Sequence, residues 1–223
     1  MRIGLFGGTF NPVHRCHLTI AAGTRDRLAL DRIVFIPTGD PPHKLSGSLA
    51  PAHHRLEMVR VAIAGEPTFS VSDLEIRRQA KSYSIDTVGA LQRQFGASAE
   101  LFFLIGLDAF LEFPTWKEAS GLLRACHFVV LGRPGSTFTS LLRMPLMPPV
   151  TPASLADLDA KRDARIEVPV LGGTALTLMQ MPPCPISASE IRQRLKHGQP
   201  VSTLLPPPVE SYIMRQNLYQ GGL

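Results

Sequence analysis

Apolar residues along this chain gather in short continuous runs, separated by longer stretches in which they recur every three or four positions. Short apolar runs are typical of buried parallel strands, and the longer spacing is typical of helices that pack on a sheet. The spacing predicts helices after His14, over 52–64, over 84–95, from Ser187 onward and near Val209–Ile213. The predicted strands are residues 3–6, 32–37, 68–72, 101–105, 127–131 and 177–181. The alternation predicts an α/β, Rossmann-like fold, mainly a parallel sheet with helices on both faces.

One segment, 136–164, follows neither pattern. It is rich in Pro and Leu, with RMPLMPPVTP at its centre. Such a stretch predicts a poorly ordered insertion or a surface excursion. The chain of 223 residues is otherwise long enough for one substantial domain, so residues 1–223 are expected to form a single domain.

Composition narrows the functional classes. Hydrophobic residues make up 44% and charged residues 18%, which is ordinary for a soluble globular protein. A net charge of +5 suits acidic small molecules, and no basic stripe interleaved with aromatic residues indicates a nucleic-acid partner. Three cysteines without metal or disulfide spacing suit a reducing cytoplasm, and no apolar run is long enough to span a bilayer.

The most informative stretch is the N-terminus. Gly7 and Gly8 follow the first predicted strand, and polar residues then open a helix. Glycines let backbone approach a phosphate, and a helix start offers N–H groups and a positive dipole end. His14 and His17 share one helix face at their spacing of three. Taken singly, the glycine pair and the histidines are weak signals. HxxH could be half of a metal site, but no matching carboxylate or thiolate set accompanies it, and the absence of GxGxxG disfavours a dinucleotide-binding dehydrogenase.

Candidate ligand-binding residues also follow later strands. Ligands of open parallel sheets bind beyond the carboxyl ends of the strands, which makes such positions informative. Ser187 with Glu190 three residues later forms a capping-box pattern, so a helix is expected to begin there, with Arg192 one turn further along. The other candidates are His43, Lys44, Gly106, Asp108, Arg133 and the chain's one tryptophan, Trp116, which follows a Pro-Thr turn.

Together these residues resemble a known family. GGTFNPVHRCHL is similar to the nucleotidyltransferase motif GGTFDPxHxGHL, and SDLEIRRQAKSYSIDT and ISASEIR are similar to SDxExxRxGxSYTIDT and ISxTxIR. Among nucleotidyltransferases the resemblance is strongest to bacterial nicotinate-nucleotide adenylyltransferases, and it covers nearly the whole chain except 136–164. The departures from the motifs are Asn11 for Asp, Cys16 for Gly, Ser84 for Thr, Ser189 for Thr and Lys117 for an aromatic residue.

The resemblance implies a reaction and a set of roles. AMP would pass from ATP to nicotinate mononucleotide, with Mg²⁺ held through the ATP phosphates and no metal ligand from protein side chains. The implied catalytic residues are His14, His17, Lys44 and Arg192. The implied ATP-binding residues are Gly7, Gly8, Thr9, Phe10, His14, His17, Arg133, Ile186, Ser187, Ser189 and Arg192. The implied mononucleotide-binding residues are Lys44, Tyr83, Ser84, Gly106, Asp108 and Trp116.

Three alternatives stay open from the sequence. The first is a nucleotidyltransferase for another substrate, such as phosphopantetheine, which SYSIDT, GLD and Trp116 disfavour. The second is a nucleotide-binding regulatory module that Cys16 has made inactive, and the third is a metal-binding protein built on HxxH. The oligomeric state also stays open, with a homodimer among the options.

Overall fold

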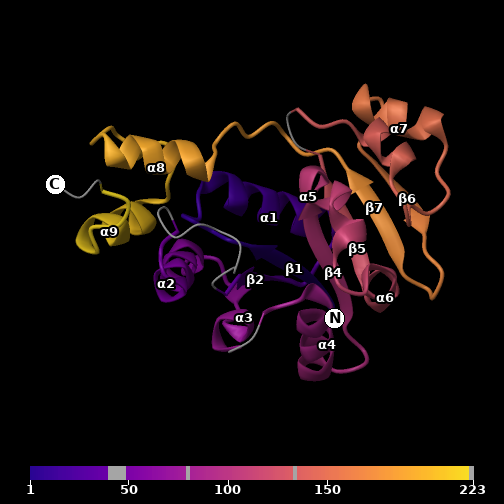
Figure 1. Ribbon diagram of the computed structural model, residues 1–223, viewed down its shortest axis with the longest axis horizontal. Coiled ribbons are helices and arrows are strands. Elements are labelled where there is room, and N and C mark those ends of the chain that lie inside the picture. The colour runs from indigo at the N-terminus through magenta and orange to yellow at the C-terminus, as the bar shows by residue number, and fades with distance from the viewer. Residues whose placement is uncertain (40–48, 79–80, 133–134, 221–223) are drawn as a thin grey trace. The chain divides into compact units, whose positions relative to one another are not determined.

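The computed structural model describes residues 1–39, 49–78, 81–132 and 135–220 (Figure 1). Over these residues seven strands form one mainly parallel sheet, which confirms the predicted α/β, Rossmann-like class. Two compact units can be distinguished by their internal contacts. The first unit comprises Met1–Phe6 and Tyr83–Pro183, and the second comprises Gly7–Ser82 and Cys184–Leu223.

In the part of the first unit that the structure describes, five strands lie in the order β1-β4-β5-β7-β6. All neighbouring pairs are parallel except β6–β7, which is an antiparallel pair. The central strand β4 reads ELFFLIG and is buried from Leu101 to Ile105, as its apolar run predicts. The strands are β1 (Arg2–Gly8, which reaches into the second unit), β4 (Glu100–Gly106), β5 (His127–Leu131), β6 (Arg165–Pro169) and β7 (Ala175–Met179).

Aromatic rings fill the first unit beside β4 and β5. Phe113 packs against Phe110 and Phe128, with ring centroids 5.3 and 5.0 Å away. All three rings are fully buried, so this cluster fixes the short turns after β4 against the sheet. The helices of this unit are α4 (Ser84–Phe95), α5 (Leu107–Leu111), α6 (Ala119–Ala125) and α7 (Pro152–Asp159), with 3₁₀ turns η1 (Phe113–Thr115) and η2 (Phe138–Arg143).

Of the two readings predicted for 136–164, a poorly ordered insertion is wrong, whereas much of the segment is exposed at the surface. The segment forms η2 and α7, which are visible beside β6 in Figure 1. The Asp159 carboxylate accepts hydrogen bonds from the Phe138 and Thr139 backbone N–H groups, at 2.6 and 3.0 Å. Leu155 and Leu158 are fully buried. Two hydrogen bonds from backbone amides to a partly buried carboxylate, together with two buried leucines, therefore order a segment that has no clear sequence period.

Over its described residues, the second unit contains a parallel strand pair and five helices. Strand β2 (Arg32–Pro37) pairs with β3 (Phe69–Val71), with Ile33 opposite Phe69. Helix α9 packs on α2, and Tyr212 contacts His54 through a 2.9 Å bond between Oη and Nδ1. The helices are α1 (Arg15–Leu28), α2 (Ala52–Ile63), α3 (Leu74–Arg77), α8 (Ala188–Lys196) and α9 (Pro207–Arg215).

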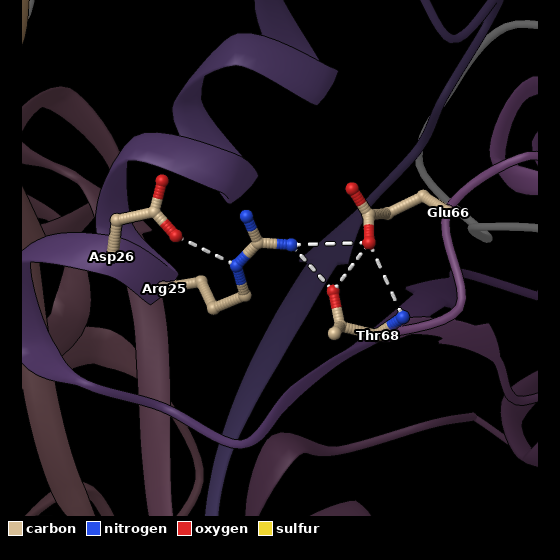
Figure 2. Close-up of polar contacts among 4 residues, drawn as sticks. All are labelled: Arg25, Asp26, Glu66 and Thr68. Atoms are coloured by element: carbon tan, nitrogen blue, oxygen red, sulfur yellow. Dashed lines mark hydrogen bonds and ion pairs between the residues drawn. The ribbon is translucent and has the colours of Figure 1, made fainter.

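A cluster of polar side chains lies near the end of α1 in the second unit (Figure 2). Arg25 donates from Nε to Asp26, and its Nη1 reaches both Thr68 and the Glu66 carboxylate, the latter at 3.2 Å. Thr68 also donates to Glu66 through its hydroxyl at 2.8 Å. These bonds, from Thr68 first and Arg25 second, hold the pKa of Glu66 below its ordinary value of 4.5.

The helix predicted over 84–95 is confirmed as α4, with Tyr83 as its N-cap and Ser84 as its first helical residue. The last strand was expected over 177–181, but β7 begins at Ala175 and ends at Met179. Strand β6 was not predicted, because RIEVP has few apolar positions and only Val168 is buried. Within the described residues, no helix is both long and apolar enough to cross a membrane.

Candidate functional site

The glycine turn follows β1, as the sequence predicts. Gly7 is exposed, whereas Gly8 lies against the Phe10 ring, which a Cβ at Gly8 would approach to 3.1 Å. The Gly8 carbonyl accepts from the Thr38 N–H at 3.0 Å, so the turn is tied to the end of β2. Phe10 is buried and adopts a positive φ of 48°. The chain therefore turns sharply at Phe10, and the ring fills the space that glycine leaves open.

His14 and His17 lie together at the start of α1. Their rings are 3.7 Å apart between centroids, and His14 is only 5% exposed. The His14 backbone N–H donates to His17 Nδ1 at 3.1 Å. An accepting Nδ1 carries no proton, so neutral His17 holds its ring proton on Nε2. The contact therefore caps the helix and leaves His17 with an N–H donor on the other side of the ring.

Asn11 connects the turn to distant parts of the second unit. Its side-chain Oδ1 accepts from the Ala50 N–H at 3.0 Å and from the Tyr219 hydroxyl at 2.7 Å. Its backbone carbonyl accepts from Arg192 Nη1 at 2.8 Å. Burial raises the pKa of the Tyr219 hydroxyl, so Tyr219 stays protonated and able to donate. The Asp of the family motif and the Asn of this chain both carry a side-chain oxygen that can accept the bonds from Ala50 and Tyr219.

The second predicted phosphate-binding element, α8, begins as expected. Ser187 is the N-cap and its Oγ accepts from the Glu190 N–H at 3.1 Å. The Glu190 carboxylate pairs with Arg194 at 2.8 Å. Arg192 reaches Ser189 Oγ at 3.2 Å as well as Asn11. Ile186, half-buried, precedes this start. A guanidinium and hydroxyl groups thus gather where the helix offers the positive end of its dipole.

The expectation that the cysteines form no disulfide is wrong for two of them. Cys16 and Cys184 are joined by a disulfide, with a Cα–Cα distance of 5.7 Å. Sequence spacing gave no signal, because 168 residues separate the two positions. The bond ties the first turn of α1 to the segment before α8. Cys126 is the free cysteine of the described residues, and burial raises the pKa of its thiol.

In the first unit, three predicted residues follow β4. Gly106 ends the strand, and Asp108 is an exposed side chain in the first turn of α5. Trp116 directly follows the η1 turn, where its half-buried ring meets Phe103 edge-on at 6.1 Å and Phe113 at 5.5 Å. The tryptophan is therefore neither a core filler nor fully exposed: one part of its surface packs on phenylalanines and another part is accessible.

Tyr83 and Ser84 lie at the start of α4, whose N-cap makes no side-chain hydrogen bond. Lys117 Nζ lies 4.7 Å from the centroid of the Tyr83 ring and 3.5 Å from Asp86 Oδ2. Lys117 thus adds positive charge beside the helix start. Helix α4 also carries Asp86 in its first turn. Lys117 pairs with that carboxylate.

Two predicted residues, Lys44 and Arg133, lie outside the described residues, as does His43. The described part of the chain contains no group of three or more His, Cys, Asp or Glu side chains that would hold a metal. The donors near α1 and α8 are imidazole, guanidinium and hydroxyl groups. These suit phosphate oxygens, whereas Mg²⁺ prefers carboxylate oxygens, water and substrate phosphates.

Sequence reasoning missed Arg55, which is fully buried in the second unit. A signal was present. Arg55 lies four residues before Val59 and eight before Ile63, both on the apolar side of α2, so its spacing places a cation on the inward face. Lys and Arg are almost never fully buried without partners, and such a position indicates a specific role.

Comparison with known proteins gives a consistent result. The family model described as cytidylyltransferase-like matches residues 5–194. A protein of Pelobacter propionicus named "Probable nicotinate-nucleotide adenylyltransferase" is 41% identical over 98% of this chain and 98% of its own. A protein of Moorella thermoacetica with the same name is 37% identical over 100% of this chain and 93% of its own.

Solved structures share the fold. The nicotinic acid mononucleotide adenylyltransferase of Plasmodium falciparum, in complex with NaAD, aligns with a TM-score of 0.71 at 19% identity. The alignment covers 98% of this chain and 97% of that one. The same enzyme in complex with APC aligns with a TM-score of 0.69 at 18% identity, over 98% of this chain and 96% of that one.

Proposed function

Because the chain belongs to the cytidylyltransferase-like family, and within it to the nicotinate-nucleotide adenylyltransferases, we propose that it transfers AMP from ATP to nicotinate mononucleotide. A phosphate oxygen of the mononucleotide attacks the α-phosphorus of ATP. The bond from that phosphorus to the bridging oxygen of the β-phosphate breaks, and pyrophosphate leaves. The product is nicotinate adenine dinucleotide. No enzyme nucleophile takes part, so the protein contributes positioning and charge neutralisation.

The observation that carries this function is the pair of histidines beside the glycine turn. The hydrogen bond from the His14 N–H holds His17 as the tautomer with an Nε2–H donor. A donor fixed before the reaction stabilises charge that develops on a phosphate oxygen without having to reorganise. We assign the turn from Gly7 to Phe10, with His14 and His17, to the ATP triphosphate.

Arg192 and the start of α8 support the same assignment. In the structure Arg192 donates to the Asn11 carbonyl, which holds it beside the histidine motif within the second unit. Arginine remains charged at all relevant pH values and suits phosphate oxygens. Mg²⁺, when bound through the ATP phosphates, supplies further charge neutralisation of the triphosphate. We assign Ile186, Ser187 and Ser189 to the same phosphates, and Lys44 and Arg133 retain their sequence-based roles.

We assign the mononucleotide to residues of the first unit. The Trp116 ring offers an apolar face for the pyridine ring, and Asp108 after Gly106 suits ribose hydroxyls. The start of α4 at Tyr83 and Ser84, with Lys117 beside it, suits the ring carboxylate. Since one family model spans most of both units, we infer that they work as a single nucleotidyltransferase domain. ATP as co-substrate leads us to place the enzyme in the cytoplasm.

The test is pyrophosphate release from ATP and Mg²⁺ with nicotinate mononucleotide, nicotinamide mononucleotide or phosphopantetheine in turn. We expect release with nicotinate mononucleotide above all, and nicotinate adenine dinucleotide as the chromatographic product. Release with phosphopantetheine alone would point to a different nucleotidyltransferase. ATP binding without release with any of the three would instead support a regulatory module.

A further inference from the structure

We propose that Arg55 is a positioning residue that sets the glycine turn for the ATP triphosphate. Its guanidinium is fully buried inside the second unit and donates to four backbone carbonyls. Nη1 reaches the Thr9 carbonyl at 2.9 Å and the Thr38 carbonyl at 2.7 Å. Nη2 reaches the Gly39 carbonyl at 3.1 Å, and Nε reaches the Ala50 carbonyl at 2.9 Å.

These carbonyls belong to three separate segments, all of which Arg55 contacts through one guanidinium. Thr9 follows β1, whereas Thr38 and Gly39 follow β2, and Ala50 precedes α2. A planar guanidinium presents several N–H donors in a fixed fork, so one side chain can fix the relative position of all these carbonyls. Lysine carries the same charge on a flexible stem without that fork.

The geometry of the peptide bond links this clamp to the turn. In a trans peptide the carbonyl of one residue and the N–H of the next point in opposite directions. The Thr9–Phe10 bond is not among the cis bonds of the described chain. Because the Thr9 carbonyl points to Arg55, the Phe10 N–H points away from it. Arg55 thus determines which way this amide of the glycine turn faces.

Space beside the clamp is limited at Gly39. A Cβ at Gly39 would lie 2.8 Å from the Glu75 backbone carbonyl. A real Cβ essentially never makes so short a contact, so only glycine fits beside Glu75 at the residue whose carbonyl accepts from Arg55. The turn at Thr9 shares the guanidinium with Gly39.

Since this inference rests on the proposed function, the experiment separates the two. ATP binding is measured by calorimetry with a non-hydrolysable ATP analogue, and KM and kcat are measured by pyrophosphate release. Turnover by the wild type tests the proposed function. The change in analogue affinity, KM and kcat from the wild type to each variant tests the role of Arg55. The variants are Arg55→Lys, Arg55→Ala and Arg60→Ala. Arg60 lies on the same helix in an exposed pair with Glu57 and serves as the matched control.

We expect Arg55→Lys to weaken analogue binding and raise the KM for ATP about tenfold or more, because bonds from a charged donor are lost. The KM for the mononucleotide should stay within about twofold, and Arg60→Ala should match the wild type. Arg55→Ala leaves buried carbonyls without their donor and is expected to be less stable. Free guanidinium ion at millimolar concentration should restore analogue binding by Arg55→Ala. The same addition should not change analogue binding by the wild type or by Arg60→Ala.

A merely structural role gives a different result. Arg55→Lys would then melt at a lower temperature but, below that temperature, would bind the analogue as tightly as the wild type. That outcome, or an equal rise in KM for both substrates, would overturn the inference. A wild type that binds the analogue but forms no dinucleotide would instead contradict the proposed function. The ratio of analogue affinities between Arg55→Lys and the wild type would still be measurable and would still test the role of Arg55.

Discussion

At the scale of single residues, hydrogen bonds to the backbone decide what the motif side chains do. His17 accepts from the His14 N–H, and Arg192 donates to the Asn11 carbonyl. Asn11 accepts from both Ala50 and Tyr219 through one oxygen. Each of these residues is held in place by a hydrogen bond within the second unit. A motif match shows which residue types are present, but only these bonds show which atom of each side chain is occupied.

The tautomer of His17 gives the first prediction. Glutamine places an amide N–H near the position of Nε2, whereas asparagine places its polar atoms near Nδ1. We expect His17→Gln to retain more turnover than His17→Asn, and His17→Ala to lose roughly two orders of magnitude or more. Asparagine can still accept the His14 N–H, so His17→Asn also serves as the folding control. Turnover measured at saturating ATP that is higher in His17→Asn than in His17→Gln would show that Nε2 is not the donor.

The pKa of Glu66 gives the second prediction. Its folded-state pKa is depressed below 4.5 by bonds from Thr68 and Arg25. The charged carboxylate therefore stabilises the fold above the unfolded pKa, and this contribution is lost as pH falls from about 4.5 through the lower folded pKa. We expect Glu66→Gln to lower the free energy of unfolding in urea at pH 7, and the difference from wild type to shrink by pH 3.

The control for Glu66 is Glu57→Gln, because Glu57 forms a single exposed pair with Arg60. Such pairs contribute little to stability. A difference between wild type and Glu66→Gln that stays constant from pH 7 to pH 3 would contradict the charge-based account, since the carboxylate then contributes through shape alone.

At the scale of elements, the disulfide between Cys16 and Cys184 joins the start of α1 to the segment before α8. Cross-linking two distant positions restricts the unfolded chain and typically stabilises a protein by about 2–4 kcal/mol. We expect Cys184→Ser to unfold at lower urea concentration than wild type under non-reducing conditions. The urea concentrations at which the two proteins unfold should converge when a dithiol reductant is added, because the wild type then loses the same bond.

Thiol titration checks the pairing directly. Of the three cysteines, only Cys126 is free, and its thiol is buried. The denatured, unreduced protein should therefore react at one thiol, and the reduced protein at three. The native protein should resist alkylation altogether. Rapid alkylation of Cys16 in the native, unreduced protein would show that the bond is absent.

Predictability from sequence also differs between elements. Strands such as β4 are continuous apolar runs, and burial on both faces leaves no other assignment. Strand β6 was missed because it pairs only at the edge and its RIEVP sequence exposes Arg165, Glu167 and Pro169. Helix α7 was missed because neighbouring prolines suggested a loop, although Thr151 as N-cap followed by Pro152 is itself a helix-start signal.

The site could be predicted only as far as local motifs reach. The glycine turn, the paired histidines and the Ser187 cap are each encoded within a few residues, and all three are found as expected. The spacing within α2 marks Arg55 as an inward-facing cation, but its distant partner Thr9 and the Cys16–Cys184 bond join residues far apart in the chain, and no local pattern specifies those pairings. Tyr219 likewise reaches Asn11 across 208 positions.

At the scale of the whole molecule, the described candidate residues of the two units differ in their chemistry. The second unit carries histidine, guanidinium and hydroxyl donors suited to phosphates. The first unit carries Trp116 and the α4 start with Lys117, suited to an aromatic ring with an anionic substituent. A change in the first unit should therefore alter the choice of mononucleotide and leave the KM for ATP nearly unchanged.

Substrate choice gives the last prediction. A carboxylate can accept from both the helix N–H groups at Tyr83–Ser84 and Lys117, whereas an amide accepts at one oxygen only. Each poorly paired buried donor costs about 1–3 kcal/mol, so two such losses correspond to a preference of roughly a hundredfold or more in kcat/KM for nicotinate mononucleotide. Lys117→Met should shrink that preference, because it removes a donor that only the carboxylate uses well. Trp116→Ala should weaken the binding of both mononucleotides equally, because stacking on the pyridine ring does not depend on its substituent. If Lys117→Met lowers kcat/KM for both mononucleotides by the same factor, as Trp116→Ala is expected to do, Lys117 does not bind the carboxylate.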